Sequence, residues 1–449
     1  MAALATASCG GGSTSTPLPQ TVSLPSPPKK HKSSVIKHVV LMIQENRSFD
    51  DLFATFPNAY GATQGRVPNG SGYTYIPLTE VNLSEPCDFG HGYAGFLRNY
   101  DGGKMDGFTL NGNKCNGKHT QPYQYVDPSQ IKSYWALAST YVLGDQMFST
   151  QGSASFTAHQ DLIAGSTLID QPNDTESIVD YPTSSPWGCD AGPGTKTSYL
   201  KWTGTKIQYE YLKGPFPCFT YPTMRDLLDA KKISWKFYTP QINTPGGIWN
   251  AFDAISAVRK GPEWSKNVIS PETTVLTDIS KGTLPAVSWI IPDRNNSDHP
   301  QSPAYHGPAW IASVVNAVGQ SKYWKNTAIV IVWDDWGGFY DNWAPPLTDH
   351  WGGLGFRVPM IVVSPYAREA QKGQAGYISH TQYEFGSILK FIEETFGLGS
   401  LNTTDERATS ISDCFDFSQS PRGFQTVPSS HSESFFLHER PSLLPVDTE

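Results

Sequence analysis

Four short apolar runs constrain the fold of this chain more than any other feature of its sequence. They occupy residues 35–43, 286–291, 328–333 and 358–363, and the first three lead directly into acidic or polar residues. Near-continuous runs of Val and Ile of this length are typical of strands that are buried on both faces, as in a parallel sheet covered by helices. The sequence therefore predicts buried strands that carry polar residues at their carboxyl ends.

Helical patterns lie between these runs. Residues 307–318 and 382–396 have apolar residues at helical spacing. Alternating β and α elements predict an α/β domain with a doubly wound, mostly parallel sheet and helices on both faces. Residues 55–130 and 165–275 are rich in Gly, Pro, Asn and aromatics with few clear periods, so we expect long loop insertions that form a cap over the active edge.

The two ends of the chain differ in composition from the middle. Residues 1–34 contain Cys9, a Gly/Ser run and a Pro/Ser segment, so a disordered tether or the remnant of a lipoprotein signal is expected, with lipid attachment at Cys9 as one possibility and an unmodified tail as the other. Residues 401–449 lose periodicity and are expected to be a packed or flexible C-terminal tail.

Charge and cysteine content narrow the partners and the compartment. The net charge of −8 gives no basic footprint for nucleic acid, and no run of 18 apolar residues is present. The five cysteines after Cys9 lack zinc-site spacing and suit an exported protein with two disulfides and one thiol left over; free buried thiols are the alternative. The simplest pairs by proximity are Cys87–Cys115 and Cys189–Cys218, which leaves Cys414.

The strand ends suggest a divalent metal site. Two adjacent carboxylates, Asp334 and Asp335, repel one another at a buried edge unless a cation or a proton lies between them. Oxygen ligands from this pair and from Glu45 and Asn46 suit a hard or borderline divalent ion. Asp298 and His299 follow the second run to the same edge, and His299 adds a nitrogen that can bind metal or transfer protons. The alternative is a solvated turn with no metal.

A nucleophile is expected in the segment 151–160, which leads into an apolar helical run. A helix start directs N–H groups and a positive dipole end toward a bound anion. Ser155 is the preferred nucleophile, and Ser153 and Thr157 are the alternatives together with a simple N-cap serine. His159 either contacts substrate or packs.

Several long motifs in fixed order resemble one known family. The sequence resembles the bacterial phosphoesterase family that contains phospholipases C and acid phosphatases, within the alkaline phosphatase superfamily. The resemblance covers roughly residues 35–400, the expected catalytic domain. The motifs are HVVLMIQENRSFDDLF (38–53), GGKMDGF (102–108), SASFTAHQDLIAG (153–165), SDHP (297–300), WKNTAIVIVWDDWGGFYDNWAPP (324–346), GFRVPMIVVSPYA (355–367) and SHTQYEFGSILKFIEETFGL (379–398).

The resemblance implies an alkaline-phosphatase-like fold and metal-dependent hydrolysis of a phosphate ester through a phosphoseryl intermediate. By motif, the metal or phosphate is held by Glu45 and Asn46 and the metal by Asp334 and Asp335, while Ser155 is the nucleophile. His299 is the second expected catalytic residue beside Ser155, and it contacts the leaving group or a phosphoryl oxygen. His159 and, more weakly, His380 are the expected substrate-binding residues.

The sequence also departs from the family pattern. Ser153-Ala154 replaces Gly-Pro before the nucleophile, Trp336 stands where many members have His, and Asn342 stands where a His often follows FYD. The resemblance allows either a phospholipid or a small phosphate ester as the substrate. It also allows the protein to associate with a membrane, either peripherally or through a lipid anchor. The alternative function is a non-catalytic envelope lipoprotein that binds a phosphorylated ligand or glycan. A sulfatase-like relative is disfavoured because Pro and Arg are absent after Ser155.

Overall fold

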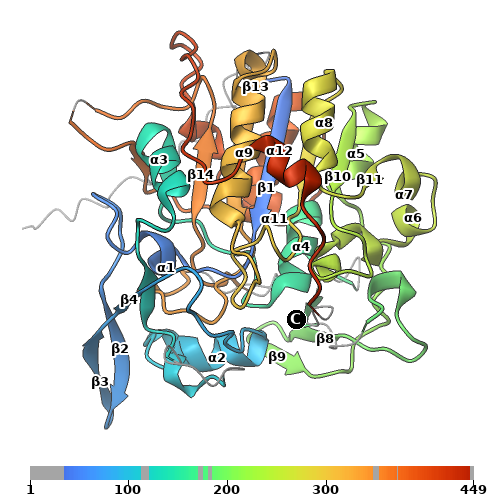
Figure 1. The fold of residues 1–449 in the computed structure, drawn as a ribbon. Coiled ribbons are helices and arrows are strands. Elements are labelled where there is room, and N and C mark those ends of the chain that lie inside the picture. The colour runs from blue at the N-terminus through green and yellow to red at the C-terminus, as the bar shows by residue number, and fades with distance from the viewer. Residues whose placement is uncertain are drawn as a thin grey trace, which may run out of the picture. The chain divides into compact units, whose positions relative to one another are not determined.

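A computed structural model describes residues 35–112, 121–169, 175–180, 185–346, 353–371 and 373–444, and residues 33–449 form one compact unit. Its centre is an eight-stranded sheet in the order β11-β10-β12-β1-β13-β14-β6-β15 (Figure 1). The bounds of these strands are β1 His38–Gln44, β6 Val142–Gly144, β10 Trp235–Tyr238, β11 Val268–Ile269, β12 Val287–Ile290, β13 Thr327–Trp333, β14 Met360–Val363 and β15 Tyr377–Ser379.

The sheet is parallel except at one strand. β1 pairs in parallel with β12 on one side and β13 on the other, with Leu41 opposite both Trp289 and Val330. β14 is antiparallel to both of its neighbours, β13 and β6. All four apolar runs of the sequence form strands, although the fourth, 358–363, points its carboxyl end to the opposite edge from the other three. The predicted α/β fold with a mostly parallel sheet is confirmed.

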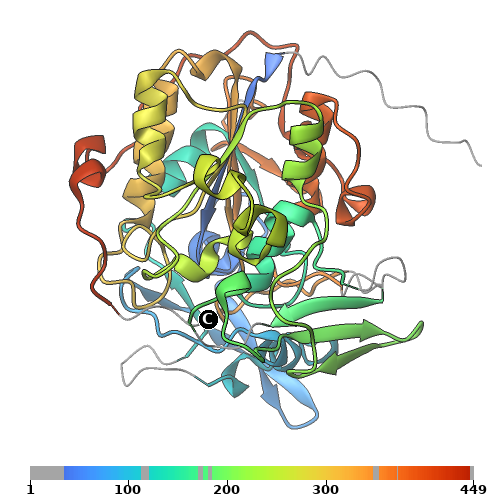
Figure 2. The same ribbon diagram turned by 90° about the vertical axis from the view of Figure 1, so that its right-hand side faces the viewer.

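Helices cover both faces of the sheet (Figure 2). α9 contacts α3 and α8 on one face, and α4 contacts α5 and α10 on the other. The α-helices are α1 Phe49–Phe53, α2 Tyr93–Tyr100, α3 Lys132–Thr140, α4 Ser155–Ala164, α5 Met224–Ala230, α6 Ser256–Arg259, α7 Glu263–Lys266, α8 Thr274–Lys281, α9 Gly307–Gly319, α10 Phe385–Phe396, α11 Thr404–Arg407 and α12 Glu433–His438. Short 3₁₀ helices occupy Asp101–Gly103, Phe108–Leu110, Gly188–Asp190, Gly247–Trp249, Ala251–Ala254, Trp324–Asn326 and Ile411–Cys414.

Local capping sets where one predicted helix begins. The helical pattern at 382–396 becomes α10, which starts at Phe385 because Glu384 and Ser387 form a reciprocal capping box. The Glu384 backbone N–H donates to Ser387 Oγ at 3.0 Å, so two groups at the helix start that lack intrahelical partners are satisfied. The pattern at 307–318 matches α9 closely.

The two insertions form small sheets beyond the carboxyl ends of β1 and its parallel neighbours (Figure 1). The first insertion supplies the hairpin β2–β3 and the pair β4–β5, and the second supplies the antiparallel sheet β7–β8–β9. The bounds are β2 Gln64–Asn69, β3 Gly72–Pro77, β4 Thr79–Val81, β5 Gln124–Val126, β7 Glu176–Asp180, β8 Ser198–Trp202 and β9 Ile207–Glu210.

The cysteines agree in part with the disulfide pairs predicted from the sequence. Cys189 and Cys218 form a disulfide within the second insertion, as predicted, and Cys414 is a buried free thiol. Cys115 lies outside the described residues, so the pair Cys87–Cys115 stays a prediction. Cys9 and the rest of residues 1–34 also lie outside them.

The C-terminal tail packs on the sheet domain over its described length. The Trp324 Nε1 group donates to the Arg422 carbonyl at 2.8 Å, and Arg422 Nη1 donates to the Thr140 carbonyl at 2.9 Å. The Asn316 side chain exchanges two hydrogen bonds with the backbone of Val427. Among the described helices, none has the length and apolar character needed to cross a membrane.

Candidate active site

Three adjacent strands deliver polar residues to one edge of the sheet. Glu45 and Asn46 follow β1, Asp334 and Asp335 follow β13, and the loop 291–300 follows β12. Because β1 lies between β12 and β13 and all three run in the same direction, residues almost 290 positions apart in sequence become neighbours.

Glu45, His159 and Asp334 form a compact group of potential ligand atoms. One ligand atom from each lies within 4.8 Å of the others, and all three residues are buried. His159 Nε2 lies 3.0 Å from Glu45 Oε1 and 3.9 Å from Asp334 Oδ2. The sequence interpretation gave His159 to substrate, whereas the structure brings it from α4 into the group of potential metal ligands.

Ser155 lies beside this group at the start of α4. Its Oγ is 3.3 Å from Asp335 Oδ2 and 3.4 Å from Asn46 Oδ1, and the residue is fully buried. Ala154 is the N-cap, and its carbonyl accepts from the backbone N–H groups at 157 and 158, so the N-cap alternative for Ser155 is wrong. The hydroxyl therefore points to the carboxylate edge rather than to its own helix.

Ser153, the first alternative nucleophile, has a different partner. Its hydroxyl donates to Asp180 Oδ1 at 3.3 Å. Thr157, the second alternative, is buried, and its Oγ1 makes no hydrogen bond among the described residues.

Asn46 joins the two strand ends through an unusual backbone conformation. Its φ of 58° lies in the left-handed region, which Asn tolerates better than most residues. In this conformation its backbone N–H donates to Asp334 Oδ1 at 2.8 Å. Gly337 passes so close that a Cβ there would overlap the Asn46 carbonyl oxygen, which explains the glycine after the Asp pair.

Burial and mutual repulsion dominate the electrostatics. Burial, followed by the charges of Asp334 and Asp335, raises the pKa of Glu45 well above its usual range. Burial and Asp334 also raise the pKa of Asp335. Burial lowers the pKa of His159 to about 4, so the imidazole is neutral and suited to metal binding.

The donor set fits a divalent cation. Glu45 Oε2 and Asp334 Oδ2 are buried and make no hydrogen bond among the described residues. Buried carboxylates that lack a partner are costly unless a cation or a proton compensates them. Carboxylate oxygens with one neutral imidazole are ligands that Mn²⁺, Fe²⁺ and Zn²⁺ accept.

His91 is a site residue that the sequence reasoning missed. Its Nδ1 donates to the Phe89 carbonyl at 2.6 Å, so Nε2 accepts from the Asn46 amide at 2.7 Å. Nε2 also lies 4.0 Å from Asp335 Oδ2. The one signal in the sequence was a histidine between two glycines in the first insertion, which was too weak to single it out.

His299 and Asp298 take different roles on the β12 loop. The His299 ring stacks on Trp249 with centroids 5.9 Å apart, and its Nδ1 donates to the Pro300 carbonyl, which leaves Nε2 as the acceptor nitrogen. Burial lowers the pKa of His299 well below its usual range, so this imidazole is neutral as well. Asp298 was expected at the active edge, but Tyr134 Oη and Trp333 Nε1 donate to its carboxylate, so it joins helix to strand.

His380 lies in a different cluster from the one that holds Ser155. Its Nδ1 donates to Asp145 Oδ2 at 2.9 Å, its ring stacks on Tyr60, and its side chain is 42% exposed. The described contacts of His380 include none with Glu45, Asp334 or Ser155.

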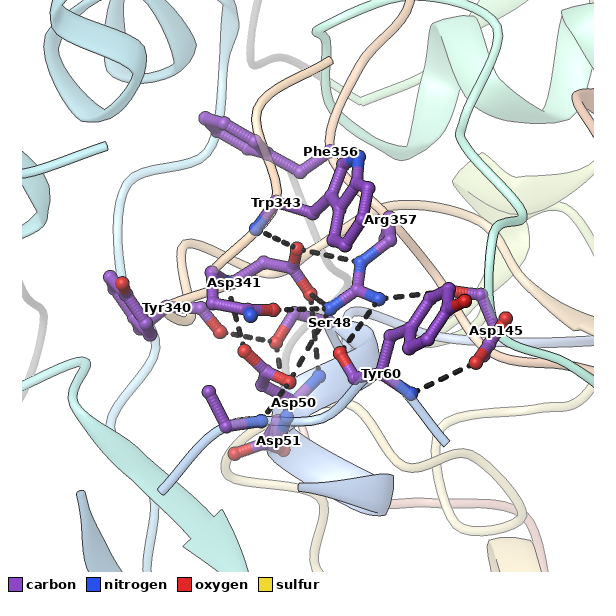
Figure 3. A network of polar contacts seen from close by, with 12 residues as sticks. Ser48, Asp50, Asp51, Tyr60, Asp145, Tyr340, Asp341, Trp343, Phe356 and Arg357 are labelled. Atoms are coloured by element: carbon purple, nitrogen blue, oxygen red, sulfur yellow. Dashed lines mark hydrogen bonds and ion pairs between the residues drawn. The ribbon is translucent and has the colours of Figure 1, made fainter. Parts of the chain in front are cut away.

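A buried arginine network supports the polypeptide next to Asn46 (Figure 3). Arg357 donates to both carboxylate oxygens of Asp341 and lies 3.4 Å from Asp50 Oδ1. It also donates to the backbone carbonyls of Tyr60 and Asp145. Two of the three departures from the family pattern have structural roles. The Asn342 amide oxygen accepts from Arg357 at 2.6 Å, and Trp336 is buried against Phe96 and Phe356.

The chain has a mostly parallel α/β sheet with a hydroxyl at a helix start and acidic residues at the strand ends, and its family membership makes it a phosphoester hydrolase. The chain belongs to the Phosphoesterase family, whose model matches residues 36–399.

Relatives with curated names are phospholipases C of low identity. Phospholipase C B of Mycobacterium tuberculosis is 24% identical, over 86% of this chain and 78% of the relative. Non-hemolytic phospholipase C of Burkholderia pseudomallei is also 24% identical, over 80% of this chain and 55% of the relative. Non-specific phospholipase C6 of Arabidopsis thaliana is 25% identical, over 87% of this chain and 74% of the relative. A solved protein of the alkaline phosphatase superfamily from Vibrio parahaemolyticus is similar at 10% identity and a TM-score of 0.37, over 84% of this chain and 72% of the solved chain.

Proposed function

We propose that this enzyme hydrolyses phosphate esters with a divalent metal ion and a phosphoseryl intermediate on Ser155. The observation that carries the proposal is the position of Ser155 Oγ, 3.3 Å from Asp335 Oδ2 at the start of a helix. A hydroxyl in this position meets the positive end of the helix dipole, where a phosphoryl anion also binds favourably.

Glu45, Asp334 and His159 hold the metal, with Asn46 and Asp335 adjacent. When bound, a divalent cation neutralises charge on the phosphoryl group and lowers the pKa of the attacking hydroxyl. Asp335 Oδ2 accepts the hydrogen bond of Ser155 and orients its oxygen for in-line attack on phosphorus. The bond from Ser155 Oγ to phosphorus forms, the P–O bond to the leaving alcohol breaks, and the proton that Ser155 loses leaves with the alcohol. Water then hydrolyses the phosphoserine and regenerates the hydroxyl.

Two histidines complete the proposed machinery. His299 presents Nε2 as an acceptor, since Nδ1 is committed to the Pro300 carbonyl, and it contacts the leaving group or a phosphoryl oxygen. His91 holds the Asn46 amide, so that Asn46 Oδ1 faces the Ser155 hydroxyl.

Substitution of the nucleophile tests the covalent step. Ser155→Ala is expected to lower kcat by at least about 10³-fold because the covalent route is lost, while the circular dichroism spectrum and the unfolding midpoint change little. Ser153→Ala is the matched control and keeps most of the activity. Equal activity in wild type and Ser155→Ala would place the nucleophile elsewhere.

Metal removal tests the cofactor. Dialysis against a chelator is expected to abolish turnover of a chromogenic phosphate ester, and titration with Mn²⁺, Zn²⁺, Mg²⁺ or Ca²⁺ identifies the ion that restores it. Full activity in the chelator would contradict the metal assignment.

The substrate we favour is a phosphate ester with an apolar leaving group, such as a phospholipid. A cavity of about 380 Å³ is lined by Tyr93, Phe96, Leu97 and Tyr209. The backbone N–H of Tyr93 and the hydroxyl of Tyr209 donate to the carboxylate of Asp180, which also accepts from Ser153 Oγ, two residues before the nucleophile. This contact chain joins the apolar cavity to the reactive edge.

A comparison of substrates tests that preference. Leu97 is 46% exposed and lines the cavity, whereas Leu110 is 61% exposed and does not. Leu97→Ser is expected to raise the KM for phosphatidylcholine several-fold and to leave kcat/KM for a small phosphomonoester unchanged, and Leu110→Ser changes neither. If Leu97→Ser lowered kcat/KM equally for both substrates, the result would contradict the preference for a phospholipid.

Export of the protein is a proposal as well. The disulfide between Cys189 and Cys218 supports an oxidising compartment.

A further inference from the structure

The antiparallel hairpin formed by β8 and β9 carries an excess of positive charge. Residues 196–216, which we call the basic ribbon, contain four lysines, one glutamate and no other charged residue. The net charge of this segment is therefore +3, in a chain whose net charge is −8. The four lysines are all exposed: Lys196, Lys201, Lys206 and Lys213. A concentration of one sign of charge on one element produces a local potential that attracts anionic partners.

Two of these lysines have acidic partners. Lys201 Nζ lies 2.8 Å from Glu176 Oε1, and Lys213 forms an ion pair with Glu210. Over the described parts of the chain, the other two lysines have no ion pair. The lysine of each pair is exposed to solvent, and exposed ion pairs contribute little to stability. An anionic surface can therefore compete with these carboxylates for the ammonium groups.

Large apolar side chains are exposed on the same ribbon, directly after β9. Tyr211 is 65% exposed, Leu212 is 36% exposed and Phe216 is 38% exposed. Lys213 lies between them in the sequence, and its long methylene chain is also apolar. Side chains that combine an apolar body with a polar tip suit the boundary between water and hydrocarbon.

Hydrogen bonds extend the ribbon beyond the paired residues of β8 and β9. The Leu212 N–H donates to Ser198 Oγ at 2.9 Å, and the Gly214 N–H donates to the Thr197 carbonyl at 2.8 Å. The Thr197 N–H donates in turn to the Pro215 carbonyl at 3.1 Å. The lysines and the exposed apolar side chains therefore belong to one ordered element rather than to separate loops.

A cavity with an apolar lining lies at each end of the basic ribbon. The cavity of about 380 Å³ described above is lined at the tip of the hairpin by Lys206 and Ile207. A second cavity, of about 390 Å³, is lined at the base of the hairpin by Pro215 and Phe216. Its lining also includes Leu168, Ile169, Phe219 and Tyr221. Exposed lysines and apolar surface thus alternate along the ribbon.

We propose that the basic ribbon docks this protein on a phospholipid membrane that contains anionic lipids. A soluble polyanion would match the lysines but would leave Leu212 and the second cavity without an apolar partner. A membrane surface matches both, because its head groups attract lysines and its acyl chains accept apolar side chains. The ribbon belongs to an insertion beyond the carboxyl ends of the parallel strands (Figure 1). Docking does not depend on the nucleophile or the metal proposed above.

Cosedimentation of the full-length protein with vesicles in EDTA tests this surface. The vesicles are phosphatidylcholine alone or phosphatidylcholine mixed with phosphatidylglycerol, and every variant carries Cys9→Ser so that lipid attachment cannot account for binding. We expect tighter binding to the mixed vesicles, weakened by added salt. Lys206→Glu together with Lys213→Glu is expected to weaken it by about 10-fold or more. Tyr211→Ser is expected to weaken it several-fold at low and high salt alike.

Matched controls separate this surface from other charges and from catalysis. Lys281→Glu together with Lys325→Glu reverses two exposed lysines that precede β12 and β13, at the opposite edge of the sheet, and is expected to keep the affinity. Ser155→Ala is expected to bind as the wild type does, so a failure of the catalytic proposal would leave this result unchanged. Unfolding midpoints close to the wild type show that the variants are folded.

Several results would overturn the proposal. They are the absence of binding to the mixed vesicles, equal binding to both kinds of vesicle, and equal affinity of the wild type and the variant with both Lys206→Glu and Lys213→Glu. Binding that is lost with Lys29→Glu and Lys30→Glu instead would assign the docking to the basic cluster at residues 29–32. Binding to heparin but not to vesicles would assign the ribbon to a soluble polyanion.

Discussion

The carboxyl group of Asp335 illustrates what it costs to bury an acidic side chain at this edge. It is fully buried and accepts from Ser155 Oγ and from the backbone N–H of Gly337. The burial and the neighbouring charge of Asp334 both disfavour its ionised form. A neutral residue of the same shape would fold more easily, which agrees with the role proposed for Asp335 beside Ser155.

Asp335→Asn separates the effect of this carboxylate on activity from its effect on stability. We expect it to abolish turnover, because the acceptor for Ser155 and a negative charge near the metal are lost. In a chelator we expect it to raise the free energy of unfolding by about 1 kcal/mol, since the shape is kept and one repelling charge is removed. Activity assays and denaturant unfolding in EDTA measure the two quantities. A chelated variant that is less stable than the wild type would contradict the electrostatic argument.

At the scale of elements, Arg357 holds three segments near the site in fixed relative positions (Figure 3). It contacts Asp50 in α1, Asp341 in the loop after β13, and the carbonyl of Asp145 after β6. The side chains of Arg357, Asp50 and Asp341 are all buried, so each depends on the others for compensation.

Arg357→Met is expected to destabilise the protein by about 3–5 kcal/mol, because two buried carboxylates lose their cation. Adding Asp341→Asn to this variant is expected to recover part of the loss. Arg98→Met, at an exposed arginine, is the control and changes stability by about 0.5 kcal/mol or less. Denaturant unfolding measures all three, and equal midpoints for wild type and Arg357→Met would show that the network contributes little.

At the scale of the whole molecule, the insertions depend on long-range links. The disulfide Cys189–Cys218 has a sequence separation of 29 and ties two parts of the second insertion together. Removing it with Cys189→Ser and Cys218→Ser together is expected to lower the free energy of unfolding by about 3 kcal/mol, since the unfolded chain gains loop entropy. Unfolding with and without a reductant measures this, and a reductant-insensitive midpoint would contradict it.

The sequence alone determined the four adjacent strands β12, β1, β13 and β14 and the polar residues that follow the first three of them. The runs at 35–43, 286–291 and 328–333 specify buried strands because their apolar character is local and continuous. The polar residues directly after them must then lie at the strand ends. For this reason the order of residues along the chain is sufficient to group Glu45 and Asn46 with the Asp pair at 334–335.

Only the tertiary structure decided which side chains complete the group. Ser155 and His159 lie on one helix, yet the packing of α4 against the sheet turns the first toward Asp335 and the second toward Glu45. His91 contacts Asn46 from an insertion without periodicity, and the carboxylate of Asp298 accepts from Tyr134 instead of joining the acidic group. These outcomes depend on contacts between residues more than 40 positions apart, and local patterns of apolar and polar residues carry no information about them.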